Sequence, residues 1–311
     1  MCGICGGLKV ILVGPADEFN RNLASKMSIP IIDLQRRVFP DGEVCPRIMI
    51  EREDQLRGEE VILSMRMPSK SCNPNSYLVE VLLAVRNLRE HIRASNIQVI
   101  MPYFPYARQD NIFRPGEPLS AKYVANLLEE AGVETVYAVT VHLHRVGSFP
   151  GLFQRARGVN ISGFPSLAEV LKRMDLVNPY IIAPDEEALV WAKEVAECLG
   201  TEDYVAFIKE RDVETGEIRT TIKEIDVRGR DAVVVDDIVS TGGTMANAVR
   251  AVREMGARKV YSAFVHPVLV GNALDRIIGA GANEIIASDT LIWEGSKASV
   301  VDQLVEEIKG R

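Results

Sequence analysis

Short continuous apolar runs alternate along this chain with segments in which apolar residues recur every three or four positions. The run from Ala232 to Val235 has the length and composition of a buried strand. The next segment predicts an amphipathic helix that ends at Gly256, with one face formed by Met245, Ala248, Val249, Val252 and Met255. This alternation predicts an α/β fold whose sheets are mainly parallel and flanked by helices.

The pattern occurs twice, at an offset of 124 residues. Residues 130–142 align with residues 254–266, and Glu, Gly, Val, Tyr, Val and His coincide at matching positions. The same offset places Ser120 on Thr244, so each copy has a hydroxyl side chain in position to cap the start of its helix. The repeat predicts two tandem duplicated domains, residues 1–150 and 151–311, each built on its own sheet.

Composition excludes several classes of function. A length of 311 residues suits two ordinary domains, and 47% hydrophobic with 25% charged residues is a globular composition. A net charge of −7 argues against a nucleic-acid-binding surface. No apolar run reaches the roughly 20 residues that span a bilayer, so we expect no membrane partner. The N-terminus lacks the pattern of a signal peptide, which favours a cytoplasmic protein.

The cysteine content also favours the cytoplasm, because few cysteines in a chain of this size are typical of a reducing compartment. The five cysteines are Cys2, Cys5, Cys45, Cys72 and Cys198. Cys2 and Cys5 form one Cys-x-x-Cys pair, without the second pair of a zinc site. The opening Met-Cys-Gly-Ile is similar to the start of amidotransferases that use an N-terminal cysteine nucleophile. A strand predicted from Leu8 leaves no room for such a domain, so we interpret the first residues as a tail.

The strand at Ala232–Val235 leads into the most informative motif of the chain. Asp236 and Asp237 follow the valines, and Thr241-Gly-Gly-Thr244 turns directly into the predicted helix. A glycine turn at a helix N-terminus binds anions, because free backbone N–H groups and the helix dipole point at one spot. Paired carboxylates suit the vicinal hydroxyls of a sugar or a hydrated Mg²⁺. In other α/β domains Gly-Gly merely turns the chain, but the complete string favours a ribose-phosphate site.

The first domain diverges at the corresponding place. Its strand, residues 97–101, leads into Pro102-Tyr-Phe-Pro-Tyr-Ala-Arg-Gln-Asp110 and a longer loop. Ligands of open parallel sheets bind beyond the carboxyl ends of the strands, so this loop is a candidate second site. Arg108 can bind a phosphate and Gln109 can donate to a base or ribose. The alternative is a packed aromatic loop with Arg108 in a surface ion pair.

The motifs resemble, in the same order and over nearly the whole length, those of the ribose-phosphate diphosphokinases, or phosphoribosyl pyrophosphate (PRPP) synthetases. The matching segments are residues 39–43, 102–110, 118–122, 140–144, 183–185, 209–211 and 235–244. The resemblance implies two type I phosphoribosyltransferase-like domains, with a last helix at about residues 300–309 that packs on the first domain. It also implies Mg²⁺-dependent transfer of the β,γ-diphosphoryl group of ATP to the 1-hydroxyl of ribose 5-phosphate, giving AMP and PRPP for nucleotide biosynthesis.

The resemblance further implies site residues. ATP is expected to contact Arg108, Gln109 and Asp110, together with Phe39, Asp41 and Glu43 from a neighbouring subunit of a homo-oligomer, a dimer or a hexamer. Ribose 5-phosphate is expected at Asp236, Asp237, Ser240, Thr241, Gly242, Gly243 and Thr244. Mg²⁺ is expected at His144 and Asp185, and Lys209 with Arg211 forms the catalytic pair of a mobile flap. Taken without the family, these segments indicate a tight turn at 39–43, a structural histidine and a charged surface hairpin.

Three positions depart from the family pattern: His142 and Ser240 stand where acids are common, and Glu187 stands where a small residue follows Pro-Asp. These departures leave two alternatives open. One is a catalytically silent homologue that binds nucleotide and regulates an active partner. The other is a type I phosphoribosyltransferase, which the ribose-phosphate motif alone permits. Retention of Arg108, Gln109, His144, the flap pair and the ribose-phosphate motif argues against the silent homologue. The Arg108–Gln109 loop, the Phe39–Glu43 motif and the duplicated domain argue against the phosphoribosyltransferase.

Overall fold

A computed structural model describes residues 9–52, 54–70, 73–143, 145, 147–211, 218–221 and 225–310, with the backbone alone for 208–211 and 218–221. The chain forms two compact units, residues 1–67, 73–161 and 301–311 in the first and residues 68–72 and 162–300 in the second. The first unit therefore extends past the expected boundary at residue 150. The physical reason is that β7 (Arg157–Ile161) pairs with β6 (Thr135–Val139) and completes the first sheet.

Within its described residues the first unit has a seven-stranded sheet of order β3-β2-β1-β4-β5-β6-β7. Its other strands are β1 (Val10–Gly14), β2 (Ile31–Val38), β3 (Val44–Ile48), β4 (Glu60–Ser64) and β5 (Asn96–Ile100). Neighbouring strands run parallel except β2 and β3, which form an antiparallel hairpin at the edge. The sheet is thus mainly parallel, as the alternation of strands and helices predicts.

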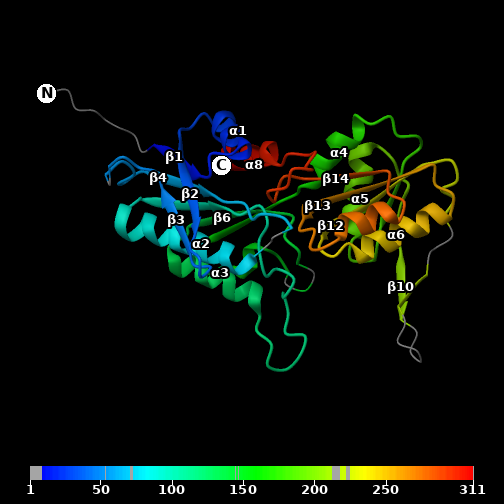
Figure 1. The fold of residues 1–311 in the computed structure, drawn as a ribbon, viewed down its shortest axis with the longest axis horizontal. Helices are drawn as coiled ribbons and strands as arrows, with labels where there is room; N and C mark the ends of the chain where they lie inside the picture. Colours follow the sequence, from blue (N-terminus) through cyan, green and yellow to red (C-terminus); the bar gives the residue numbers. More distant parts are fainter. Residues whose placement is uncertain are drawn as a thin grey trace. The chain divides into compact units, whose positions relative to one another are not determined.

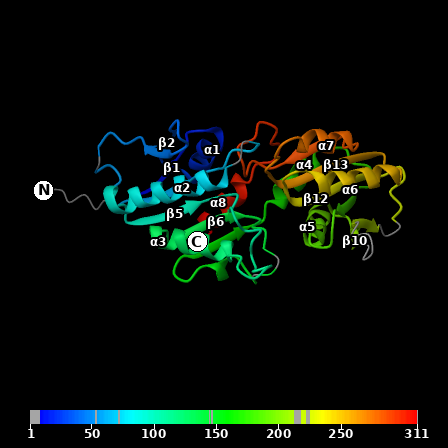
Figure 2. The same cartoon turned by 60° about the horizontal axis from the view of Figure 1, so that its bottom comes forward.

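Helices cover both faces of this sheet (Figure 1; Figure 2). From β1 the chain steps toward one edge of the sheet to reach β2, and from β4 through β5 to β6 it steps toward the other edge. Because crossovers between parallel strands are right-handed, the helices of these two series lie on opposite faces of the sheet. These helices are α1 (Glu18–Met27) on one face and α2 (Pro74–Arg86) and α3 (Ser120–Ala131) on the other. The last helix, α8 (Val301–Lys309), lies beside α1, where Lys309 Nζ donates to the carbonyl of Lys26 at 2.7 Å.

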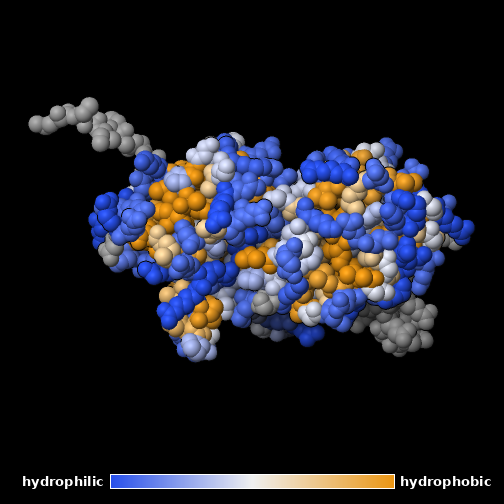
Figure 3. Space-filling view, turned by 45° about the horizontal axis from the view of Figure 1, so that its top comes forward, coloured by the Kyte–Doolittle hydropathy of each residue, from blue (hydrophilic) through white to orange (hydrophobic). Residues whose placement is uncertain are grey.

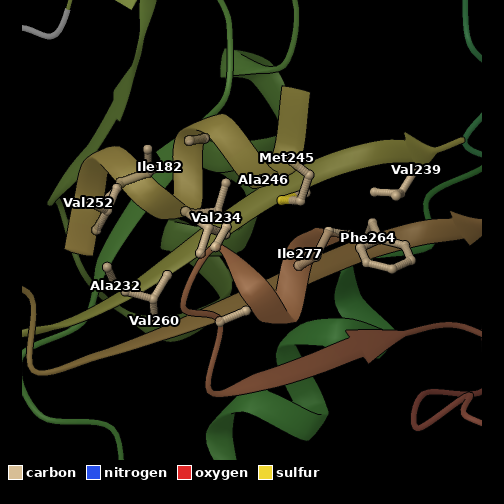
Figure 4. Close-up of a cluster of buried hydrophobic side chains, with 14 of the residues drawn as sticks. Ile182, Ala232, Val234, Val239, Met245, Ala246, Val252, Val260, Phe264 and Ile277 are labelled. Carbon is tan, nitrogen blue, oxygen red and sulfur yellow. The ribbon is translucent and has the colours of Figure 1, made fainter. Parts of the chain in front are cut away.

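The second unit has, among its described residues, an all-parallel five-stranded sheet of order β14-β13-β12-β8-β9 and a separate two-stranded hairpin. The sheet strands are β8 (Tyr180–Ala183), β9 (Tyr204–Ala206), β12 (Asp231–Val239), β13 (Lys259–Pro267) and β14 (Glu284–Ala287). Helices α4 (Phe164–Lys172) and α5 (Leu189–Leu199) pack on this sheet, as do α6 (Gly243–Glu254) and α7 (Ala273–Gly279). Figure 4 shows Val234, Val252, Phe264 and Ile277 converging in the core between the sheet and the helices α6 and α7.

The repeat is visible in the structure as α3 followed by β6 and α6 followed by β13. Each helix is succeeded by a left-handed glycine, Gly132 at φ 106° and Gly256 at φ 93°. The predicted hydroxyl caps are wrong. Ser120 and Thr244 lie inside the first turns, and the N-cap residues Leu119 and Gly242 make no side-chain cap hydrogen bond.

No helix in the described part of the chain is both long and apolar enough to cross a membrane. On the face drawn in Figure 3, hydrophilic residues dominate and hydrophobic residues reach the surface in separate patches. Among the described cysteines, Cys45 is exposed and Cys198 half-buried, and both are free thiols. Cys2, Cys5 and Cys72 lie outside the described residues.

The turn after residue 152 is fixed by one buried carboxylate. Glu129 of α3 accepts the backbone N–H groups of Gln154, Arg155 and Ala156 at 2.6, 2.6 and 2.9 Å. Burial alone would raise the pKa of Glu129, but the three hydrogen bonds outweigh it and hold the pKa below its ordinary value. We expect Glu129→Ala to lower the free energy of unfolding at neutral pH by about 3 kcal/mol, because it leaves three N–H groups without their acceptor.

This contribution depends on pH. Because the folded-state pKa is lowered, the stabilisation is complete above the ordinary glutamate pKa and is lost as the pH falls through the folded value. Urea unfolding at neutral and acidic pH measures it, with the exposed neighbour Glu130→Ala as the control. Equal losses in the two variants would contradict the assignment.

Candidate functional site

The turn after β12 is shaped by glycine. The strand continues through Asp236 and Asp237 to Val239, and a short turn then leads into α6. Gly242 has φ 73°, and a Cβ there would lie 2.9 Å from the carbonyl oxygen of Ala273. A side chain at Gly242 would therefore meet both backbone strain and a steric clash.

The N-terminus of α6 lies beside this turn. Met245 and Ala246, buried in the core, hold its first turn in place (Figure 4). Because no side chain caps the helix, its leading N–H groups and the positive end of its dipole are available to an anion. Free N–H groups at the start of a helix are common anion ligands in proteins.

Three carboxylates gather at the ends of β8 and β12. Asp236 is half-buried and accepts the N–H of Asp237 at 2.9 Å, and Asp237 is buried. Asp185 follows β8 and accepts the N–H of Ala188 at 3.2 Å. Burial, then the charges of Asp237 and Asp185, raise the pKa of Asp236 well above its ordinary value. Carboxylates crowded in this way fit a cation or the hydroxyl donors of a sugar.

We expect Asp236→Asn to stabilise the protein by about 1 kcal/mol at neutral pH in the absence of divalent cations. The amide keeps an acceptor for the N–H of Asp237 and removes the repulsion between carboxylates. Because the folded-state pKa is raised, native stability falls as the pH rises through that value, so the gain should be absent near about pH 4 and grow above it. Thermal unfolding across this pH range, with the exposed Asp175→Asn as the control, checks the prediction. A gain independent of pH would contradict it.

In the first unit, the loop from Pro102 to Asp110 follows β5. Arg108 is exposed, whereas the amide of Gln109 donates to the carbonyl of Asn111 at 2.9 Å and to the carboxylate of Glu117 at 3.2 Å. Binding a ligand through Gln109 thus requires its amide to leave these partners. Asp110 is buried, and its Oδ2 accepts the backbone N–H of Arg145 at 2.7 Å. The loop is therefore tied to the segment that follows β6.

That segment is strained where it leaves β6. Thr140 is buried with φ 41°, a left-handed conformation that is unfavourable for a β-branched residue. The N–H of the next residue, Val141, donates to Asn160 Oδ1 at 2.9 Å and helps to hold the bend. Such strain concentrates at functional sites. His142 is half-buried, and His144, the expected metal ligand, lies outside the described residues.

The Phe39–Glu43 motif forms the turn of the β2–β3 hairpin. The N–H of Phe39 donates to the carbonyl of Glu43 at 2.8 Å, and the N–H of Gly42 donates to that of Phe39 at 2.9 Å. Asp41 and Glu43 are exposed and line a surface hollow of about 510 Å³ together with α2. The tight turn indicated by Asp-Gly is confirmed. This turn follows β2 and the Arg108 loop follows β5, and these two strands lie three strand spacings, or about 14 Å, apart in the sheet.

Lys209 and Arg211 belong to β10 (Ile208–Arg211), which pairs with β11 (Ile218–Thr221) as an antiparallel hairpin. This matches the charged hairpin indicated by the sequence, and the two side chains lie outside what the structure describes. Two of the positions that depart from the family pattern lie in turns of the second unit. Glu187 is exposed in the turn before α5, and Ser240 lies in the turn after β12. The carbonyl of Ser240 accepts the N–H of Val270 at 3.0 Å.

Two contributors to these sites were not predicted from the sequence. Glu117 holds Gln109 from across the long loop, and Ala273 packs directly on Gly242. Neither contact has a local sequence signal. Among the described residues no group of three or more His, Cys, Asp or Glu side chains is arranged to hold a metal ion.

Comparisons with known proteins cover both units. Residues 8–132 match the family model of the N-terminal domain of ribose phosphate pyrophosphokinase, and residues 166–289 match that of the phosphoribosyl transferase domain. The chain is 36% identical to a ribose-phosphate pyrophosphokinase of Sulfurisphaera tokodaii, across 94% of this chain and 97% of the relative. Identity to that of Methanothermobacter thermautotrophicus is also 36%, across 96% and 99%. A crystal structure of phosphoribosylpyrophosphate synthetase from Mycobacterium smegmatis superposes with a TM-score of 0.81 at 27% identity, across 97% of this chain and 98% of that one.

Proposed function

The chain belongs to the ribose-phosphate pyrophosphokinase family, and from that premise we propose how its residues carry out PRPP synthesis. The observation that supports the assignment most strongly is the glycine turn after β12, where an uncapped helix N-terminus stands beside Asp236 and Asp237. In this proposal the 5-phosphate of ribose 5-phosphate binds the N–H groups from Ser240 to Thr244. The two aspartates bind its 2- and 3-hydroxyls.

ATP binds in the first unit at Arg108 and Gln109. Arg108 is exposed and free of the packing that buries its neighbour Asp110, so its guanidinium can pair with phosphate oxygens. The buried carboxylate of Asp110 has a supporting role through the N–H of Arg145, which keeps the loop and the segment near His144 together. This assigns Asp110 a positioning function within the ATP site.

The acidic residues fit Mg²⁺. Magnesium prefers oxygen ligands and is commonly bound by one or two carboxylates plus substrate phosphates, so a preformed cluster of protein ligands is not required. Burial, and then the nearby charges of Asp237 and Asp185, raise the pKa of Asp236, and a bound cation would offset that repulsion between carboxylates. We propose Asp185 of the second unit and His144 of the first as residues that would hold Mg²⁺. When bound, it neutralises the phosphate oxygens of ATP.

The chemistry is a displacement at the β-phosphorus of ATP. The anomeric oxygen of ribose 5-phosphate bonds to that phosphorus, the bond from the phosphorus to the α-phosphate oxygen breaks, and AMP leaves. The hydroxyl proton is released. Phosphoryl transfer of this type depends on alignment and on electrostatic stabilisation rather than on a covalent intermediate. Lys209 and Arg211 supply positive charge to the transferring group.

The test is an assay of the purified protein with Mg²⁺, ATP and ribose 5-phosphate, in which the nucleotide product is identified. The proposal predicts AMP and PRPP in equal amounts. ADP would indicate a simple kinase, and nucleotide binding without turnover would indicate a silent regulatory homologue. Consumption of PRPP with a base, and no synthesis of it, would indicate a phosphoribosyltransferase.

We also propose that the ATP site is shared between two copies of the chain. The Phe39–Glu43 turn follows β2 and the Arg108 loop follows β5, with β1 and β4 between these strands in the sheet. In this proposal the turn that contacts the nucleotide comes from another copy. Helices α2 and α3 carry exposed apolar pairs at i and i+4, which are Val79 with Leu83 and Tyr123 with Leu127. Apolar stripes of this kind favour burial against a protein surface.

Subunit complementation tests the shared site. Glu43→Ala and Arg108→Ala should each be weakly active alone, because each damages every site. After dissociation and mixing, a two-fold pair formed from one copy of each contains one intact site, so activity should return to about a quarter of wild type. Mixing either variant with itself is the control. No recovery on mixing, with oligomers demonstrably exchanged, would contradict the shared site.

A further inference from the structure

The turn assigned to the sugar phosphate has no positive side chain of its own. Residues 236–245 include two aspartates and neither lysine nor arginine. A phosphate monoester carries nearly two negative charges at neutral pH, whereas a helix N-terminus offers about half a positive charge. With Asp236 and Asp237 nearby, a phosphate at this turn needs a further cation.

The chain after β13 is built against the turn. The N–H groups of Leu269 and Val270 donate to the carbonyls of Val239 and Ser240, each at 3.0 Å. Ala273, the first residue of α7, touches Gly242, and Ile277 of the same helix points into the core beside Met245 (Figure 4). The position of α7 is therefore fixed relative to the turn and to α6.

This arrangement brings one arginine to the N-terminus of α6. Arg276 Nη1 lies 3.5 Å from the position that a Cβ on Gly243 would occupy. The arginine is exposed, and Nη2 stands at 3.5 Å from Asn272 Oδ1, the outer limit of a hydrogen bond. We propose that Arg276 is a further substrate-binding residue, which contacts the 5-phosphate of ribose 5-phosphate; this rests on the function proposed above.

Electrostatics favours this role. A guanidinium beside the positive end of α6 is repelled by the helix dipole. A phosphate bound between them is attracted both by the helix N-terminus and by the guanidinium. Arg276 also lies in the last turn of α7, whose negative end favours a cation. A purely structural arginine would therefore affect stability alone, whereas a phosphate contact affects the affinity for ribose 5-phosphate.

The experiment compares Arg276→Gln with Arg250→Gln, which removes the same charge from an exposed position on α6, about two turns from its start. We expect Arg276→Gln to raise KM for ribose 5-phosphate by about 10- to 100-fold, since a charged hydrogen bond is lost. The kcat, the KM for ATP and the thermal stability should change little. Arg276→Lys should restore part of the affinity, and Arg250→Gln should behave as wild type.

Calorimetry with ribose 5-phosphate alone separates this proposal from the function on which it rests. If the wild type binds ribose 5-phosphate and Arg276→Gln binds it with equal affinity, the arginine has no role and the rest of the site stands. If Arg250→Gln lost as much affinity for ribose 5-phosphate as Arg276→Gln, the loss would come from the change in net charge. That result would overturn the proposed contact between Arg276 and the phosphate. If the wild type does not bind ribose 5-phosphate, the proposed sugar-phosphate site and the arginine contact both fail.

Discussion

Replacing Lys209 or Arg211 by alanine is expected to lower kcat by about 100- to 1,000-fold each, with little change in KM or in thermal stability. Both residues are assigned to the transferring diphosphoryl group, where a preorganised charge is worth about 3–4 kcal/mol in the transition state. Their strand pairs only with β11, in a two-stranded hairpin separate from the five-stranded sheet, so we expect the fold to tolerate the substitutions. Steady-state kinetics of PRPP formation measures the effect.

Lys193→Ala is the matched control, because Lys193 is an exposed lysine on α5 in the same unit, with Glu197 as its ion-pair partner. It should retain wild-type turnover. Binding of ATP and of ribose 5-phosphate, measured without turnover, should persist in the Lys209 and Arg211 variants. Turnover within threefold of wild type in both variants would remove them from the catalytic role.

The second large effect is expected for Gly242→Ala. The residue has φ 73°, which costs an alanine about 1 kcal/mol, and its Cβ would lie 2.9 Å from the carbonyl oxygen of Ala273. Either the turn or α7 must move, and the N–H groups that converge on the phosphate move with it. Because a displacement of about 1 Å can cost 100-fold in rate, we expect kcat/KM for ribose 5-phosphate to fall by about that factor.

Gly229→Ala separates backbone strain from site geometry. Gly229 has φ 70°, but a Cβ there would meet nothing within 4 Å, and the residue lies away from the turn. Both substitutions should destabilise the protein by a similar strain energy, whereas only Gly242→Ala should impair ribose 5-phosphate binding. Similar kinetics in the two variants would show that the turn tolerates a side chain.

Most of the fold could be predicted from the sequence, because the patterns that indicate strands and helices are local and occur twice. Apolar runs, amphipathic spacing and Gly256 are enough to predict the alternation of strands and helices and the approximate C-terminal end of α6. The boundary between the units was harder to place, because β7 is assigned to the first unit by its pairing with β6 and not by its own composition. The predicted caps failed for a related reason. Gly242 turns the chain so early that α6 begins one residue before Thr244.

The site was predictable only in part. The β12 turn is continuous in sequence, so its residues could be recognised together. The hydrogen bonds of Gln109 to Glu117 and of Asp110 to the backbone of Arg145 join separate segments, and no local pattern reveals them. The left-handed Thr140 is likewise invisible in a sequence, because a β-branched residue gives no sign that it will adopt φ 41°.

A crystal structure of the protein with ribose 5-phosphate tests the central claim most directly. The claim is that the sugar phosphate is bound by the β12–α6 turn. It predicts the phosphate within hydrogen-bond distance of the N–H groups of Gly242, Gly243 and Thr244, with the sugar hydroxyls toward Asp236 and Asp237. Density for ribose 5-phosphate elsewhere in the chain, with this turn empty, would contradict it.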